Sequence, residues 1–344
     1  MDETLYGTRD RRGHFKPKEP ARPAPLFAWP PRPVALLRWL PHYFLPWNLF
    51  FLATAAAVWA FALPEVEAVA RLEWGWVLRL LLVNALLVLL LFGLFELRLY
   101  VRRAQGIRFK YNPEFPSDRK NPAFAFGRQD VDNALRTFGL GVPIWTAWEA
   151  IVLHAFAAGW VPWVSFAQSP WYLIGLAVLL RLFHEAHFYC IHRLIHTPFL
   201  YKWVHSVHHN SVNPSPWSSL SMHPVELLLY FSTAALHLMV PSHPLLAIYQ
   251  LHIAGLGAVV GHIGFDRIEL GRKTAVPTEA FVHYLHHKYF EVNYADGLVP
   301  FDRWFGTWHD GSPEAEARMQ ARYRARKERA KANAAAAGGA SGAA

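Results

Sequence analysis

Long apolar runs separated by polar stretches dominate the pattern along this chain. Six apolar segments stand out, at residues 46–63, 76–97, 138–159, 171–190, 225–241 and 244–262. Each can cross, or nearly cross, a hydrocarbon core of about 30 Å at a rise of about 1.5 Å per residue. The last two are the shortest, and only a short turn separates them, so we expect a tight helical hairpin that spans part of the membrane. The pattern predicts an all-α, polytopic integral membrane protein with four transmembrane helices plus a shorter helical hairpin.

The polar segments between these runs differ in their content of lysine and arginine. The tail 1–41 carries eight and loop 98–137 carries nine, whereas loop 64–75 carries one and loop 160–170 carries none. Cytoplasmic loops of membrane proteins hold the excess of basic residues. The alternation therefore predicts that both termini, residues 191–224 and everything from residue 263 onward lie on the cytoplasmic side, where they form a helical cap.

Changes in composition divide the chain into four predicted parts. Residues 1–41 read as a basic, proline-rich cytoplasmic tail, and residues 42–165 as the N-terminal transmembrane helices with the polar loop 98–137 between them. Residues 166–311 hold the chemistry-bearing side chains and form the predicted catalytic domain. Residues 312–344 are predicted to be a basic helix, exposed or lying on lipid headgroups, followed by a low-complexity tail.

Composition and charge agree with a membrane protein. The chain is 53% hydrophobic and only 17% charged, whereas soluble domains are typically about 25% charged. Because basic residues of membrane proteins mark the cytoplasmic face and its anionic lipids, we attribute the net charge of +9 to that face rather than to nucleic acid. The single cysteine, Cys190, excludes an intramolecular disulfide.

Histidines are concentrated in three short elements of the predicted cytoplasmic face. "HRLIH" carries two of them, and "HSVHH" and "HYLHH" each carry three; they are His192, His196, His205, His208, His209, His283, His286 and His287. Residues three and four apart share one face of a helix, so each element can offer imidazoles from adjacent turns to a metal ion. Buried imidazoles without a metal would each need a hydrogen-bond partner, which makes core packing the weaker interpretation.

Eight imidazoles exceed the needs of one four-coordinate ion, so the sequence predicts two ions. Imidazole suits iron, zinc and copper. Soluble di-iron bundles use glutamates together with Glu-x-x-His, but these histidines have few carboxylates beside them. Neutral ligands leave the positive charge of the metals intact, which favours a strongly oxidising centre that binds dioxygen and removes hydrogen from an unactivated C–H bond. A Gly-rich dinucleotide fingerprint and a haem motif are both missing from the sequence, which predicts an external electron donor.

The three elements, in this order and between membrane helices, resemble the fatty acid hydroxylase / sterol desaturase superfamily. The resemblance runs from about Trp171 to Trp308 and includes "SMHPVE" at 221–226, "GHIGF" at 261–265 and "NYADGLVPFDRWFGTW" at 293–308. It implies a histidine-rich di-metal site that holds two non-haem Fe²⁺ ions at the cytoplasmic face of the membrane. Carried over by position, the ligands are the eight histidines above together with His223 and His262.

Neighbouring residues depart from the simplest form of this pattern. Glu185 occupies the position seven residues before the first element, with additional histidines at 184 and 187. "HEAH" is not the H-E-x-x-H motif of zinc proteases. We expect His184 and His187 to support the site or to lie on a helix face rather than to bind metal. The histidines inside apolar helices are expected to be packing residues.

The sequence thus predicts a membrane-bound di-iron oxidoreductase that uses O₂ to hydroxylate or desaturate a lipid, such as a sterol or a fatty acyl chain. Its expected partners are the bilayer, a lipid substrate from it, and an electron-transfer protein of the cytochrome b5 or ferredoxin type. The alternative is a histidine-rich membrane protein that binds or transports metal without oxygenase activity. A transporter would place its histidines along a transmembrane path, whereas these lie at one face.

Overall fold

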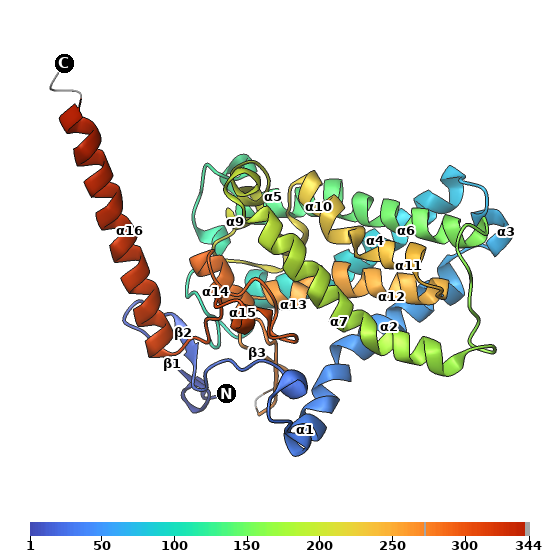
Figure 1. The fold of residues 1–344 in the computed structure, drawn as a ribbon, viewed down its shortest axis with the longest axis horizontal. Helices are drawn as coiled ribbons and strands as arrows, with labels where there is room; N and C mark the ends of the chain where they lie inside the picture. The colour runs from blue at the N-terminus through green and yellow to red at the C-terminus, as the bar shows by residue number, and fades with distance from the viewer. Residues whose placement is uncertain (272, 341–344) are drawn as a thin grey trace.

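The structure, a computed structural model, describes residues 1–271 and 273–340 and is almost entirely helical (Figure 1). The helices that precede the first histidine element are α1 (Pro33–Phe44), α2 (Trp47–Ala57), α3 (Val66–Val69), α4 (Trp74–Phe95), α5 (Gln129–Arg136) and α6 (Val142–Ala157). The remaining helices are α7 (Pro170–Ile195), α8 (Pro198–Leu200), α9 (Ser206–His209), α10 (Pro224–Phe231), α11 (Leu236–Met239), α12 (Pro244–Gly255), α13 (Ala258–His262), α14 (Phe281–Tyr289), α15 (Phe301–Trp304) and α16 (Pro313–Ala340). Two antiparallel hairpins, which the all-α prediction missed, pair β1 (Gly7–Arg9) with β2 (Phe15–Pro17) and β3 (Arg267–Glu269) with β4 (Ala275–Pro277).

Five helical stretches in the described residues are long and apolar enough to cross a membrane, one more than the four predicted. They are Pro33–Ala62, Trp74–Val101, Gln129–Ala157, Pro170–Ile195 and Pro244–His262. The difference lies in the predicted hairpin, whose two arms are unequal. Its second arm, α12 and α13, runs for 19 residues, whereas the first arm, Pro224–Met239, is shorter and a 3-10 turn separates its two helices. The chain is therefore an integral membrane protein in which the last long apolar helix is also the most enclosed.

Helix α12 forms the centre of the helical bundle. It contacts α2, α6 and α7, and nearly all of its side chains are buried. Helix α4, in contrast, buries one face and exposes a row of leucines, including Leu78, Leu82, Leu86 and Leu90. A monomeric soluble protein rarely exposes so much contiguous apolar surface, so this face of α4 suits contact with lipid.

A buried polar contact joins two of the membrane helices. The Asn84 side-chain amide on α4 donates to the carboxyl of Glu149 on α6 at 2.7 Å and to the hydroxyl of Thr146 at 3.1 Å. All three side chains are almost fully buried. Hydrogen bonds between membrane helices avoid leaving polar atoms unsatisfied in hydrocarbon, so this contact holds α4 against α6.

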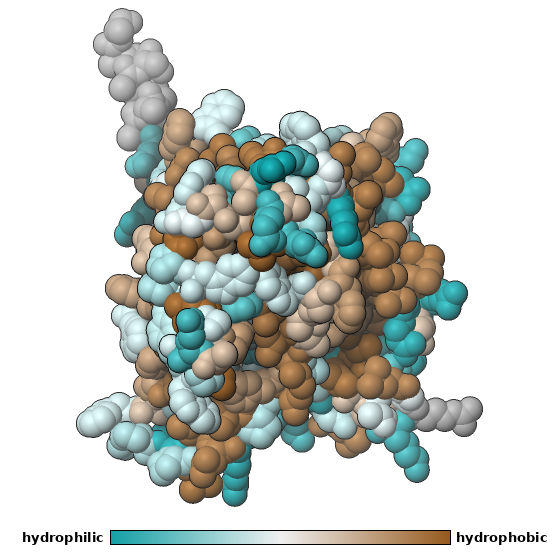
Figure 2. Space-filling view, turned by 90° about the vertical axis from the view of Figure 1, so that its right-hand side faces the viewer, coloured by the Kyte–Doolittle hydropathy of each residue, from teal (hydrophilic) through white to brown (hydrophobic). Residues whose placement is uncertain are grey.

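The segments that connect the long helices gather at two opposite ends of the bundle (Figure 1). One end carries α3 and the loop at 158–169, where Trp163 pairs with Ser242 of the α11–α12 turn. Figure 2 looks onto this end and shows mostly apolar and weakly polar side chains with a few strongly hydrophilic ones. The other end carries α9, α13, α14 and α15, the loop at 102–128 and both hairpins. The segments predicted to share one face thus lie together.

The N-terminal tail is folded onto this second end rather than extending from it. Phe15 of β2 is 1% exposed and packs with Phe109, Tyr111 and Tyr284. Backbone hydrogen bonds join Ala21 to the carbonyl of Asp310 at 2.8 Å and Ala24 to that of Gly297 at 2.9 Å. The tail therefore braces α14 and the loop that follows it.

Helix α16 projects away from the bundle (Figure 1) and covers the segment 313–331, for which a basic helix was expected. It continues to Ala340, into the segment that was expected to be low-complexity tail; residues 341–344 lie outside the described residues. Its N-terminal half contacts the body through Met319, through Tyr289 of α14, which donates a hydrogen bond to Glu316, and through Arg326, which pairs with Glu291. The basic residues beyond Tyr323 are exposed.

Replacing Asn84 with Leu should destabilise the α4–α6 contact, because the carboxyl of Glu149 loses its hydrogen-bond donor while it stays buried. We expect a loss of about 1 kcal/mol, in the range measured for hydrogen bonds between membrane helices. The thermal unfolding midpoint in detergent measures it. Leu82→Ala, on the exposed face of the same helix, serves as the control and should leave the midpoint nearly unchanged.

Candidate metal centre

Four elements bring the histidines together at one end of the bundle. Helix α7 ends at Ile195, just before Thr197–Pro198, because a residue that precedes proline disfavours helical geometry. It therefore delivers His192 and His196 from its last turn. The second histidine element spans a π-helical turn at Tyr201–His205 and the short helix α9. Single π-helical turns occur often at functional sites, since they re-aim a side chain.

The third element lies on α14, and α13 supplies one further imidazole. Helix α14 ends at Phe290, which adopts a left-handed backbone (φ 64°) and whose N–H donates to the His286 carbonyl at 2.7 Å. At Gly261 of α13, a Cβ would lie 3.3 Å from the His283 ring. A glycine at this position lets the two helices approach closely enough for His262 to reach α14.

Two groups of imidazole nitrogens result, each of which could hold a metal ion. The ligand atoms within each group all lie within 4.8 Å of one another. The group of five contains His192, His196, His205, His209 and His286, and the group of four contains His208, His262, His283 and His287. Nine of the ten predicted ligands are thereby brought together. Both groups consist of histidine alone among the described residues.

The two groups interleave along the sequence, which accounts for the repeated H-x-x-H-H spacing. In the second element, His205 and His209 belong to the group of five while His208 belongs to the group of four. In the third element the assignment is reversed, since His283 and His287 join the group of four. Each adjacent pair of histidines thus sends one imidazole to each group.

Four of the grouped imidazoles are oriented by hydrogen bonds at Nδ1, the ring nitrogen that faces away from the centre of each group. The Nδ1 of His192 lies 2.8 Å from the Tyr294 carbonyl oxygen and that of His286 lies 2.7 Å from the Val292 oxygen. The Nδ1 atoms of His208 and His262 face the carbonyl oxygens of Ser221 at 3.3 Å and Ala258 at 2.8 Å. A carbonyl oxygen can only accept, so each Nδ1 carries the hydrogen. Each Nε2 therefore presents a lone pair to the interior of the site.

The spacing of the Nε2 atoms fits bound metal ions. Without an ion, Nε2 lone pairs face one another with no hydrogen between them. The Nε2 atoms of His208 and His262 face each other at 3.2 Å, although both carry lone pairs. In the group of five, the Nε2 atoms of His196, His209 and His286 are 3.1–3.3 Å apart. Nitrogens bound to one ion at about 2.1 Å, with bond angles of 90–110°, are separated by about 3.0–3.4 Å. A cation at the centre of each group would convert these repulsive contacts into coordination.

Burial keeps these imidazoles uncharged. Desolvation, reinforced by the neighbouring imidazole of His286, lowers the pKa of His196 to about 2, and desolvation lowers the pKa of His286 to about 4. Desolvation and the surrounding imidazoles also hold the pKa values of His209 and His287 well below the ordinary value. Only the neutral imidazole has the lone pair that binds a metal, so the ligands are ready to coordinate at neutral pH.

The "HPVE" motif contributes through its glutamate. Glu226 lies 2.8 Å from the Nδ1 of His205, and both side chains are buried. This is the carboxylate–histidine pairing that orients metal ligands in many sites. The structure does not bring His223 into either group. Its Nδ1 accepts a hydrogen bond from the Val225 backbone N–H at 3.2 Å and caps α10, which leaves the ring hydrogen on Nε2.

Two carboxylates hold the loop that follows α14. Glu185 on α7 accepts from the backbone N–H groups of Gly297 at 2.9 Å and Leu298 at 3.0 Å. Asp302 accepts from those of Tyr294 at 2.9 Å and Ala295 at 2.8 Å. The loop in turn positions the Tyr294 carbonyl that orients His192. The role of Glu185 could not be predicted from the sequence, because a contact between residues 112 positions apart leaves no local spacing signal.

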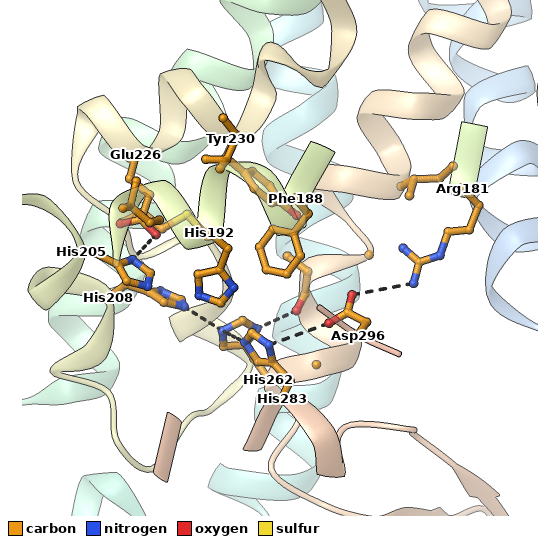
Figure 3. Close-up of a pocket in the computed structure, with 17 residues that line it drawn as sticks. Arg181, Phe188, His192, His205, His208, Glu226, Tyr230, His262, His283 and Asp296 are labelled. Carbon is orange, nitrogen blue, oxygen red and sulfur yellow. Dashed lines mark hydrogen bonds and ion pairs between the residues drawn. The ribbon is translucent and has the colours of Figure 1, made fainter. Parts of the chain in front are cut away.

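A cavity opens beside the two groups (Figure 3). Its walls include imidazoles of both groups, among them His192, His208 and His283, and the apolar side chains Phe188, Ile191, Ile195, Met222, Tyr230 and Ile253. Arg181 and Asp296 line it at the side away from His205 and Glu226 (Figure 3). The cavity is lined by apolar side chains together with imidazoles of both groups, so a group bound in it would lie next to the candidate metal ligands.

The other histidines near the first element lie outside both groups. His184 packs against Phe188 and Tyr230, and the Nε2 of His187 lies 3.0 Å from the Ser232 hydroxyl. His184 lies about two turns before His192 on α7, and neither His184 nor His187 belongs to either group of imidazole nitrogens. That these two histidines support the site or lie on a helix face without binding metal stays a prediction.

Comparison with known proteins supports the resemblance of the three histidine elements. Residues 177–307 match the family model named fatty acid hydroxylase. The chain is 29% identical to a Delta(7)-sterol 5(6)-desaturase of Gibberella zeae over 43% of this chain and 46% of that protein. It is 32% identical to methylsterol monooxygenase 1 of Gallus gallus, over 43% and 51%, and 26% identical to the Delta(7)-sterol 5(6)-desaturase of Saccharomyces cerevisiae, over 43% and 46%.

The chain spans about half the length of the curated relatives it matches. No solved structure matches it. The matched segment contains all three histidine elements and every loop described around them. Residues 177–307 therefore belong to the fatty acid hydroxylase / sterol desaturase superfamily.

Proposed function

We propose that this protein is a membrane-bound di-iron oxidoreductase that uses O₂ to hydroxylate or desaturate an unactivated C–H position of a lipid. The observation that carries the proposal is the pair of imidazole groups whose Nε2 lone pairs converge beside an apolar cavity. The printed names of the relatives, which are desaturases and a monooxygenase of sterols, support an oxidoreductase that acts on lipids. The metal-bearing end would face the cytoplasm, as the distribution of lysine and arginine predicts.

In this proposal, the group of five and the group of four would each hold one iron ion. Bound iron supplies the capacity to activate O₂ and to accept electrons from an external donor protein of the cytochrome b5 or ferredoxin type. Backbone carbonyls and Glu226 fix the ring orientations by accepting from Nδ1. The group of four offers one imidazole fewer, and His208, His262 and His283 from it line the cavity. Its ion would therefore have more room for a non-protein ligand on the side where the lipid lies.

The apolar walls would place the hydrocarbon and keep water away from it. Phe188 and Tyr230 lie together on one side of the cavity (Figure 3), and Met222 and Ile253 also line it. Nothing in this lining separates hydroxylation from desaturation, because both begin with removal of one hydrogen from the same chain. A metal transporter is the less favoured alternative, since both groups lie at one end of the bundle and do not follow a path across it.

Purified protein should contain about two irons per chain, and His287→Ala should reduce this to about one. The substitution removes one of only four imidazoles in its group and leaves the other group complete. Metal analysis of detergent-purified protein measures it. His223→Ala is the matched control and should retain about two irons, since His223 caps α10; a wild-type content of one iron or none would refute the two-ion site.

Expression in a lipid-profiled host should produce an altered lipid that a His208→Ala, His209→Ala variant does not produce. The pair removes one ligand from each group, so both ions are weakened at once. Mass spectrometry distinguishes a product with added oxygen from one with two hydrogens fewer. Two irons per chain without any lipid change, in a host with a suitable electron donor, would favour the metal-binding alternative.

Metal-free protein should lose stability as the pH falls from about 6.5 toward 4. His286 has a folded pKa of about 4, below its ordinary value of 6.5, so the unfolded chain binds the proton first and acid favours unfolding. This residue alone accounts for up to about 3 kcal/mol, at about 1.4 kcal/mol for each pH unit between the two pKa values. Unfolding midpoints between pH 8 and pH 5 measure the loss, and His286→Gln should make the dependence shallower. An unfolding midpoint that stays constant over this range would contradict the assignment.

A further inference from the structure

Arg181 is an unusual residue in its position on α7. It lies in the middle of a helix that is long and apolar enough to cross a membrane. Among the residues that line the cavity it is the one lysine or arginine. A cation in a membrane helix is costly unless it has a partner, and such residues generally serve a substrate or an ion.

The partner of Arg181 is Asp296, but the two side chains do not touch. The nearest guanidinium nitrogen and carboxylate oxygen are 3.9 Å apart, beyond the range of a hydrogen bond. The other carboxylate oxygen lies 3.9 Å from the Nδ1 of His283 (Figure 3). Within the described part of the chain, the Arg181 guanidinium donates no hydrogen bond and the Asp296 carboxylate accepts none. The two side chains are 25% and 38% exposed, so a donor group and an acceptor group face the same cavity and are accessible to a ligand.

The surrounding structure holds both groups in place. Glu185, one helical turn after Arg181, binds the backbone N–H groups of Gly297 and Leu298, directly after Asp296. Asp302 binds the N–H groups of Tyr294 and Ala295, directly before it. Asp296 therefore sits at the centre of a loop clamped on both sides, so the separation from Arg181 is built into the fold.

Resting on the function proposed above, we infer that Arg181 and Asp296 bind a free hydroxyl group of the lipid substrate. A hydroxyl can donate to the carboxylate and accept from the guanidinium at the same time. A methyl ether or an ester can only accept, so it leaves Asp296 unpaired. A carboxylate can only accept as well, and repulsion from Asp296 offsets its attraction to Arg181. The pair thus selects lipid alcohols.

The position of the pair also restricts where the substrate reacts. Asp296 lies beside His283, a member of the group of four, while the apolar walls continue from Phe188 to Met222. A hydroxyl bound at Asp296 brings the carbons nearest to it closest to that group. The oxidised C–H position should therefore be only a few bonds from the hydroxyl-bearing carbon.

The test compares matched ligands that differ only in the hydroxyl hydrogen. Iron-loaded protein in nanodiscs is titrated with cholesterol and its methyl ether, and with 1-hexadecanol and its methyl ether. We expect at least one of the two alcohols to bind about tenfold or more tightly than its ether, since hydrogen bonds to charged groups are the strong ones. Arg181→Met and Asp296→Ala should each remove most of this difference. Arg79→Met, on α4 away from the cavity, is the matched control and should retain it.

Because either single change leaves one charge unpaired, the double variant Arg181→Met, Asp296→Leu supplies a neutral site if the single variants fail to fold. Normal iron content verifies that each variant is assembled. Equal binding of alcohol and ether by the wild type, or full preference retained in the folded variants, would overturn the inference. Lipid oxidation without a preference for the alcohol refutes this inference alone, whereas a preference for the alcohol in protein that oxidises no lipid refutes the proposed function alone.

Discussion

The candidate metal centre depends on the hydrogen bonds that its imidazoles make through Nδ1, the ring nitrogen on the outer side of each group. Each donation from an Nδ1 to a backbone carbonyl fixes the tautomer of the ring, so that Nε2 keeps its lone pair inside a buried space. The carbonyls of Val292 and Tyr294 belong to one loop, and that loop is held by Glu185 and Asp302. The electronic state of the imidazoles is thus set by backbone geometry several residues away. Loss of the loop would free the rings to turn and to take the other tautomer.

Much of the candidate site could be predicted from the sequence because its main signal is local. Spacings of three and four residues place imidazoles on one helix face whatever the rest of the fold does. The assignment of each imidazole to one of two groups could not be predicted in this way. His208 and His209 are neighbours in the chain but serve different groups, because the partners that select them come from α13 and from the end of α7. Similarly, "HPVE" offers both a histidine and a glutamate, and only the packing of α10 shows that Glu226 reaches His205 while His223 caps the helix.

In the fold, too, the features that depend on neighbouring residues could be predicted, and those that depend on contacts between distant segments could not. Apolar length predicted the membrane helices well, since hydrocarbon thickness is the same constraint everywhere. It underestimated the arm at 244–262, which is the most enclosed of the long helices and contains the polar side chains of Gln250 and His252. The two hairpins were missed because strands of three residues carry almost no periodic signal. The folded N-terminal tail was missed because basic, proline-rich composition does not reveal that one aromatic side chain, Phe15, has a buried site on α14.

The attachment of the N-terminal tail to the end of the chain has a consequence for assembly. Ala21 and Ala24 pair with Asp310 and Gly297, so residues that are synthesised early find their partners in a segment that is synthesised much later. Until that later segment is synthesised, Phe15 has no buried site and the tail cannot pack on α14. The order of synthesis therefore delays closure of the metal-bearing end until the whole domain is present.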